Sequence, residues 1–297
     1  MAARRIFTCV SRGVLAGDDA SGLSAYLGGM VVGGFRARVA IKRALAQVRS
    51  RRVASGVTIL TYHRVGGGSP DELDLDVAAF IDHINVLSSA DVVSLDEAAL
   101  RLAADDRSPC VVLTFDDGFA DVYENAWPLL RKRRLPFTLY LATRYVGGRM
   151  RWDGATAKSD GAALSWDQIA EFVDSGLCTL GNHTHSHVRP GELTNVELDA
   201  CSDEIERYVG FRPLHFAYPW GLAIEHLEGE LRQRFRTAVT GAVGRNLPGQ
   251  DPIRLRRVPV RRTDPLEFFQ AKLTGQLLPE RAYGALVATA KKAGARA

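Results

Sequence analysis

Short apolar runs alternate with amphipathic stretches along the chain, and this alternation predicts the order of its elements. Runs rich in Val, Ile, Leu, Phe and Tyr predict strands, whereas apolar residues three and four positions apart predict helices. The expected strands are VTILTYHRV (57–65), CVVLTF (110–115), FTLYLA (137–142), CTLGNH (178–183), LHFAYPWG (214–221) and RTAVTGA (236–242). The expected helices are residues 76–90, 120–135, 164–176, 193–210 and 226–235. Alternation of this kind is typical of a parallel sheet, open or closed into a barrel.

The N-terminal part of the chain has a different character, so residues 1–55 are expected to form an extension and residues 56–297 one domain. The apolar stretch at 23–35 has 13 residues, and a membrane-spanning helix needs about 20. Residues 36–52 carry seven Arg or Lys, which favours either a solvated helix or a basic amphipathic helix lying on a membrane. Arg12 interrupts the first apolar segment. We therefore expect no signal peptide and a cytoplasmic or peripheral membrane protein.

Composition describes an ordinary soluble globular protein of 297 residues, 46% hydrophobic and 24% charged. The formal net charge of +4, from 38 Lys and Arg against 34 Asp and Glu, is too mild to indicate a nucleic-acid-binding protein. None of the four cysteines lies in a C-x-x-C pair. Buried reduced thiols are therefore expected, rather than a disulfide framework or a metal cluster.

Polar residues gather where the predicted strands end. The stretch LTFDDGFADVY (113–123) places Asp116 and Asp117 directly after a strand, and HTHSH follows another strand with three histidines in five residues. If that segment turns helically, His183 and His187 share one face and can bind a divalent metal such as zinc. The simpler alternatives are structural histidines and an Asx turn at the acids.

Two adjacent carboxylates have separate uses beside such a metal. One completes the ligand set of two imidazoles, and the other serves as general base towards a water whose pKa the metal lowers from about 15.7 towards about 7. Side chains alternate in direction along a strand, so Asp116 and Asp117 must diverge at its end to take these roles.

The motifs TFDDG and HTHSH, with LSWDQIAEF before the histidines and FAYPWG after them, resemble the polysaccharide deacetylases, the NodB-homology carbohydrate esterases. The resemblance extends over about residues 57–242 and implies an irregular (β/α) barrel with seven strands. It implies that Asp116 is the catalytic base. It also implies that Asp117, His183 and His187 hold the metal, for which zinc is expected.

The chain departs from the family pattern at two places. Many members carry Arg-x-Pro-Tyr in the third motif, and in those members the Arg orients the catalytic base. In FAYPWG, Ala217 stands at the Arg position and Trp220 at the Tyr position. The Trp220 backbone N–H can still serve as the oxyanion donor. The late general-acid histidine of many members is absent, because no His follows His226. His63, after the first strand, is expected to be the acid, as in the branch that deacetylates poly-β-1,6-N-acetylglucosamine.

Aromatic residues near these motifs are candidates for stacking on sugar rings, although aromatic residues more often belong to a core. Tyr218, Pro219 and Trp220 are predicted to bind substrate, and Trp152 and Trp166 are further stacking candidates.

The resulting hypothesis is a hydrolase of carbon–nitrogen bonds other than peptide bonds. We expect it to remove acetyl groups from N-acetylhexosamine units of an acetylated glycan, of the chitooligosaccharide or exopolysaccharide type. The rivals are a haloacid-dehalogenase phosphatase, whose acids are spaced D-x-D, an iron oxygenase, and a non-catalytic glycan-binding module on the same fold.

Overall fold

The computed structural model describes residues 34–47, 52–152 and 161–294. They form two compact units. The larger unit contains residues 52–262 and 272–275, and the smaller contains the described parts of residues 1–51, 263–271 and 276–297. This division differs from the boundary expected near residue 55, because C-terminal residues join the N-terminal helix instead of the barrel.

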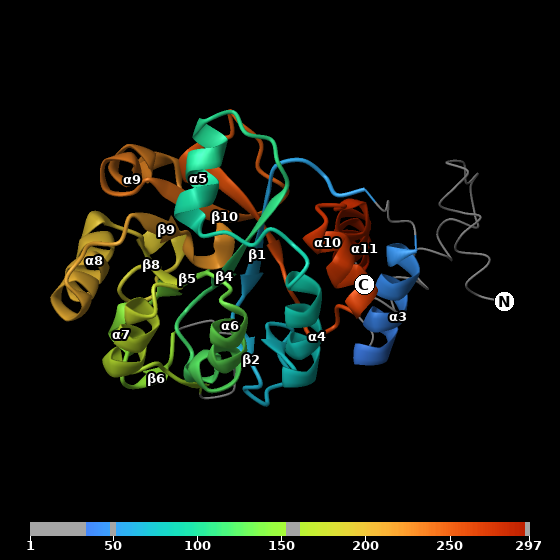
Figure 1. Ribbon diagram of the computed structural model, residues 1–297, viewed down its shortest axis with the longest axis horizontal. Helices are drawn as coiled ribbons and strands as arrows, with labels where there is room; N and C mark the ends of the chain where they lie inside the picture. Colours follow the sequence, from blue (N-terminus) through green and yellow to red (C-terminus); the bar gives the residue numbers. More distant parts are fainter. Residues whose placement is uncertain (1–33, 48–51, 153–160, 295–297) are drawn as a thin grey trace. The chain divides into compact units, whose positions relative to one another are not determined.

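The larger unit is a closed barrel of seven parallel strands (Figure 1). Around the barrel they are β1 (Val57–Tyr62), β11 (Leu255–Pro259), β10 (Thr237–Val243), β9 (His215–Ala217), β8 (Cys178–Asn182), β5 (Phe137–Leu141) and β4 (Cys110–Phe115). The pairing of β1 with β4 runs without interruption from Val57 opposite Cys110 to Tyr62 opposite Phe115. The predicted seven-stranded (β/α) barrel is confirmed.

Helices connect the strands and cover the barrel from outside (Figure 1). They are α4 (Val77–Leu87), α5 (Leu95–Ala103), α6 (Trp127–Arg133), α7 (Trp166–Asp174), α8 (Asn195–Val209) and α9 (Glu228–Arg234). All six residues of β1 and of β4 are buried, as expected for strands covered on both faces. Because every barrel strand is parallel, the loops at their carboxyl ends meet at one mouth.

Sequence signals for helix ends agree with the structure. Ser165 caps α7 in a capping box with Gln168. Gly210 ends α8 in the left-handed conformation at φ 83°. Pro128 lies in the first turn of α6, directly after a π-helical turn (Val122–Ala126). The proline therefore starts the regular helix and does not interrupt it.

Several short elements shape the loops of the larger unit. Strand β2 (Arg64–Val65) pairs with β3 (Asp74–Leu75), and β6 (Arg149–Met150) pairs with β7 (Gly161–Ala162). The 3₁₀ turns are η2 (Thr143–Tyr145), η3 (Pro190–Glu192), η4 (Pro219–Gly221), η5 (Glu225–Leu227) and η6 (Pro252–Arg254).

The smaller unit contains α3 (Phe35–Ala46), α11 (Leu278–Gly294) and the first six residues of α10 (Leu266–Leu273). Apolar residues of α3, including Ile41, pack against Phe268 and Tyr283. Lys42 is fully buried and forms a 2.7 Å ion pair with Asp264.

The predicted membrane contact through residues 36–52 gains no support, because the apolar face of α3 is used inside this unit. Among the described helices, none combines the length and apolar character needed to cross a bilayer. The expectations for the leader segment and for residues 23–35 fall almost entirely outside the described residues. Cys110 and Cys201 are buried free thiols, as expected, whereas Cys178 is free but half-buried. Cys9 lies outside the described residues.

Candidate active site

A cavity of about 340 Å³ lies in the larger unit, lined by residues from the carboxyl ends of its strands. Residues from both predicted chemical motifs meet there, together with aromatic residues from neighbouring loops. The lining includes His63, Asp116, Asp117, His183, His187, Tyr218 and Trp220. Pro219 is buried and does not line the cavity. Pro219 is therefore expected to shape the loop, and not to contact substrate directly.

The backbone after β4 explains how two adjacent acids take different directions. Asp116 continues the strand pairing, because its N–H donates to the Tyr62 carbonyl at 3.0 Å. Asp117 then adopts the left-handed region at φ 76°, and Gly118 follows at φ 98°. A left-handed residue other than glycine costs about 1–2 kcal/mol. The fold therefore maintains an unfavourable conformation that points the second carboxylate away from the first.

The HTHSH segment is not helical, so its histidines do not meet through one turn of a helix. Residues 183–187 form an irregular loop, in which Thr184 and His187 are left-handed at φ 67° and 52°. The N–H groups of His185 and Ser186 donate hydrogen bonds to Glu197 of α8. The two rings nevertheless meet, with 4.9 Å between their centroids.

Asp117, His183 and His187 form the cluster found among the described residues whose atoms could hold a metal ion, here called the metal-ligating cluster. Oδ1 of Asp117 lies 3.5 Å from Nε2 of His183 and 3.6 Å from Nε2 of His187. This oxygen is buried and has no hydrogen-bond partner within the described structure. His183 Nδ1 lies 2.8 Å from the Ala217 carbonyl, so that Nδ1 donates and Nε2 carries the lone pair. These atoms fit a divalent metal with nitrogen and oxygen ligands.

His185, the remaining histidine of the motif, points away from the cluster. Its Nδ1 lies 3.0 Å from Oγ1 of Thr143 and 3.3 Å from Oε2 of Glu204. It does not line the cavity.

Charges around the cluster favour ionised acids. Burial opposes ionisation of Asp116, but the positive charge of Arg257, with His183 and His63, outweighs it and lowers the pKa of Asp116. For Asp117, burial is again outweighed, here by the close approach of His183 and of the other nearby histidines, so its pKa is also lowered. Burial dominates at His187 and lowers its pKa to about 4. A neutral imidazole is the form that binds metal.

Sequence analysis did not identify Arg257, which contacts the predicted base. Arg257 lies on β11 and is buried, and its Nη1 donates to Oδ1 of Asp116 at 2.7 Å. Its Nε donates to the Thr240 carbonyl at 3.1 Å. Ala217 on β9 has no guanidinium to offer Asp116, and Arg257 on β11 places one beside this carboxylate instead. The only sequence signal was a pair of arginines inside an otherwise apolar run.

His63 lies on the other side of the base, with Nε2 3.9 Å from Oδ2 of Asp116. Its Nδ1 is buried and has no hydrogen-bond partner among the described residues. His63 therefore faces the same cavity as the metal-ligating cluster, as its place after β1 predicts.

Aromatic residues form the cavity walls. Trp152 packs on His187 at 4.3 Å between centroids, and Trp220 lies 5.4 Å from the same ring. Tyr218 lines the cavity but is fully buried. Trp166 instead stacks on Tyr208 at 4.3 Å, and it does not line the cavity. Of the stacking candidates, Trp152 and Trp220 are therefore the two that offer a ring to a ligand.

The loop bearing Trp220 is held close to β10. Trp220 is left-handed at φ 61°, and Gly221 follows at φ 70°. A Cβ at Gly221 would lie 2.8 Å from the Cα of Gly241, which is closer than packed carbon atoms tolerate. Glycine at this position therefore lets the loop approach the strand.

Comparison with known proteins gives one family. The sequence profile described as polysaccharide deacetylase matches residues 103–233. A putative polysaccharide deacetylase, YxkH of Bacillus subtilis (strain 168), is 28% identical over 140 residues, 46% of this chain and 45% of the relative. The poly-beta-1,6-N-acetyl-D-glucosamine N-deacetylase of Staphylococcus epidermidis is 33% identical over 25% of this chain and 24% of the relative. The chain thus spans less than half the length of these curated relatives.

A solved structure extends the likeness to a larger part of the chain. The structure of IcaB from Ammonifex degensii matches with a TM-score of 0.63 and 29% sequence identity, covering 75% of this chain and 97% of the other. The crystal structure of BA0330 from Bacillus anthracis, at 23% identity and a TM-score of 0.62, has the same fold.

Proposed function

We propose, on the premise that this chain contains a domain of the polysaccharide deacetylase family, that it hydrolyses N-acetyl groups of a glycan with the help of a divalent metal. The carrying observation is the unpartnered Asp117 Oδ1, at 3.5 and 3.6 Å from two imidazole nitrogens. A separate carboxylate, Asp116, lines the same cavity.

Asp117, His183 and His187 would hold the metal. Two imidazoles and one carboxylate suit zinc and leave coordination positions for water and substrate. When bound there, the metal polarises the acetyl carbonyl and acidifies water. His183 is already oriented by its bond to the Ala217 carbonyl, which is the usual way a protein fixes a ligating imidazole.

The remaining polar residues would move protons. Asp116 accepts a proton from the water that adds to the acetyl carbonyl, and Arg257 keeps this carboxylate ionised and oriented. His63 donates a proton to the nitrogen as the carbon–nitrogen bond breaks, so that a free amine and acetate are released. The Trp220 N–H would donate to the oxyanion that forms before this bond breaks.

An N-acetylglucosamine unit is the proposed substrate. Its flat apolar ring face suits the indole rings of Trp152 and Trp220, which lie on the cavity wall. The S. epidermidis relative is named for poly-β-1,6-linked N-acetylglucosamine, so we propose this linkage first. The β-1,4 linkage of chitooligosaccharides is second.

The proposal is tested by measuring acetate release from β-1,6-linked oligomers, chitooligosaccharides and acetylated nucleotide sugars in parallel. We expect release that requires an oligosaccharide and favours the β-1,6 linkage. Tight binding of an oligosaccharide by the zinc-loaded chain without any acetate release would indicate a non-catalytic glycan-binding module. Release from none of the three substrates, with none of them bound, would contradict both functions.

A further inference from the structure

The two imidazoles of the metal-ligating cluster are oriented in different ways. His183 has a hydrogen bond from Nδ1 to the Ala217 carbonyl at 2.8 Å. His187 is buried, yet its Nδ1 has no hydrogen-bond partner among the described residues. Its ring is contacted by Trp152, which also lines the open cavity. The direction of His187 Nε2 therefore depends on the backbone of the loop that carries it.

That loop is supported by α8 and by η2. From η2, the Arg144 N–H donates to the His185 carbonyl at 2.9 Å, and the Tyr145 hydroxyl donates to the Ser186 carbonyl at 3.1 Å. The His185 N–H donates to the Glu197 carbonyl at 3.1 Å. The Glu197 carboxylate accepts twice from Ser186, at 2.8 Å from its N–H and 2.7 Å from its hydroxyl. With Thr184 and His187 both left-handed, the loop has no regular structure that would hold it in place without these contacts.

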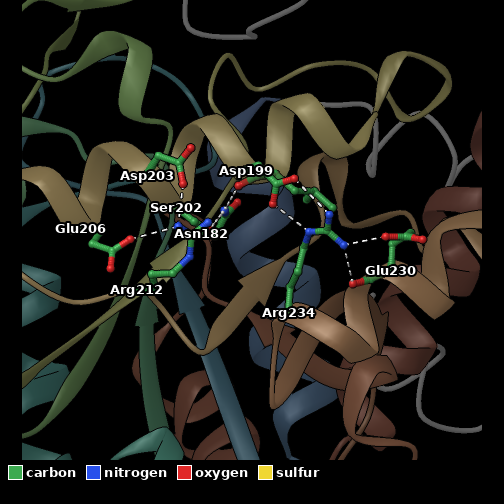
Figure 2. Close-up of polar contacts among 9 residues, drawn as sticks. Asn182, Asp199, Ser202, Asp203, Glu206, Arg212, Glu230 and Arg234 are labelled. Carbon is green, nitrogen blue, oxygen red and sulfur yellow. Dashed lines mark hydrogen bonds and ion pairs between the residues drawn. The ribbon is translucent and has the colours of Figure 1, made fainter.

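The start of the loop is fastened to the same helix by Asn182, the last residue of β8. Its side-chain amide donates to the Leu198 carbonyl at 2.8 Å and to Oγ of Ser202 at 2.9 Å, and Figure 2 shows the contact with Ser202. Its carbonyl oxygen accepts from the Thr184 N–H at 2.8 Å. Helix α8 thus holds the loop at its start and at its middle.

Two acids of α8, Glu197 and Glu204, contact the loop, and Glu204 lies 3.3 Å from Nδ1 of His185. The other three acids of the helix pair with arginines. Asp199 pairs with Arg234, and Asp203 and Glu206 pair with Arg212 (Figure 2). Glu197 has no ion pair within the described structure, and both of its oxygens bond to the loop. A half-buried carboxylate without an ion pair loses favourable hydration, and the two hydrogen bonds from Ser186 compensate for that loss.

We propose that Glu197 is a positioning residue that sets the direction of the His187 ring by holding Ser186. Helix α8 then orients one of the three residues that would bind the metal. This inference rests on the proposed metal-dependent function. It assigns no contact between Glu197 and substrate or metal. Its effect is on the affinity for the metal, because a displaced imidazole weakens the ligand set without removing a ligand.

The test is zinc affinity, measured by competition with a chromogenic chelator. Glu197→Ala should weaken zinc binding on the order of ten- to a hundredfold, the usual range for residues that orient metal ligands. Glu197→Gln should retain most of the affinity, because an amide can accept from the Ser186 N–H and donate to its hydroxyl. Asp199→Ala is the matched control, since it removes an acid two residues away that contacts Arg234. It should lower the thermal stability and leave zinc affinity unchanged.

Equal zinc affinity of Glu197→Ala and the parent overturns the inference, as does an equal loss in Asp199→Ala. If Glu197→Ala does not fold, Ser186→Ala removes one contact from the loop side. A weaker affinity then supports the inference, and an unchanged affinity overturns it. A parent chain that binds no zinc contradicts the proposed function itself, which separates that failure from a failure of Glu197 alone.

Discussion

Replacing Arg257 with Met removes the positive charge beside the predicted base while keeping most of the side-chain volume. Both partners of the Arg257–Asp116 pair are buried, and their contact is 2.7 Å. The substitution leaves a buried carboxylate without its guanidinium, and this is the situation in which removing one partner of an ion pair is most costly.

The magnitude follows from the geometry. With the two charge centres about 4 Å apart, the attraction is about 4 kcal/mol at an effective dielectric constant of 20. Breaking buried pairs typically costs about 3–5 kcal/mol. For a unit of this size, about 4 kcal/mol corresponds to a decrease in melting temperature of roughly 10 °C. Turnover should fall as well, because the base loses the group that orients it.

The assay is thermal unfolding together with turnover and zinc content, all near pH 7. The pKa of Asp116 is lowered in the fold. Its contribution to stability is therefore complete above the unfolded carboxyl pKa of about 3.9 and is lost as the pH falls through the folded value. Arg256→Met is the control, because Arg256 is the exposed neighbour on the same strand. It should change stability by less than about 0.5 kcal/mol.

A double-mutant cycle separates the pair from other effects of Arg257. In an Asp116→Asn background the carboxylate charge is gone, so Arg257→Met should cost much less than in the parent. The reasoning is refuted if Arg257→Met melts with the parent, or if its cost is the same in both backgrounds.

Two further predictions concern the acids and the histidine. Asp117→Asn should lose zinc, whereas Asp116→Asn should retain it and lose about 10²- to 10⁴-fold in turnover; equal zinc loss in both would show that the two roles are misassigned. His63→Ala should retain zinc and lose turnover with acetamides, whose amine must be protonated on leaving, but lose much less with an activated aryl acetate. Equal cleavage of both substrates by His63→Ala and the parent would make His63 a structural residue.

Six of the seven barrel strands follow from apolar runs in the sequence, but β11 does not. Its LRRVP sequence places Arg256 and Arg257 in the middle of the strand, which breaks the run that identifies a buried strand. Arg257 is tolerated there because Asp116, 141 positions away in the chain, compensates its charge. A contact of that sequence separation leaves no local signal.

The sequence also predicted that the site residues lie close together, but not the conformation of every loop that carries them. Asp116, His63 and His183 follow different strands, and parallel strands bring their carboxyl ends to one mouth. The conformation of the histidine loop was not predictable from spacing, because the loop contains left-handed residues and is held by hydrogen bonds to α8 and η2 instead of by regular helical hydrogen bonds. The position of Trp152 was not predictable from the sequence either, because its contact with His187 joins two separate segments of the chain.

The most direct measurement of the central claim is acetate release from a β-1,6-linked N-acetylglucosamine oligomer by the purified chain. It is made on the zinc-loaded chain, after removal of metal by a chelator, and after zinc is added back. The account predicts release by the loaded chain, none after chelation, and recovery with zinc. Undiminished release after complete removal of metal would contradict it.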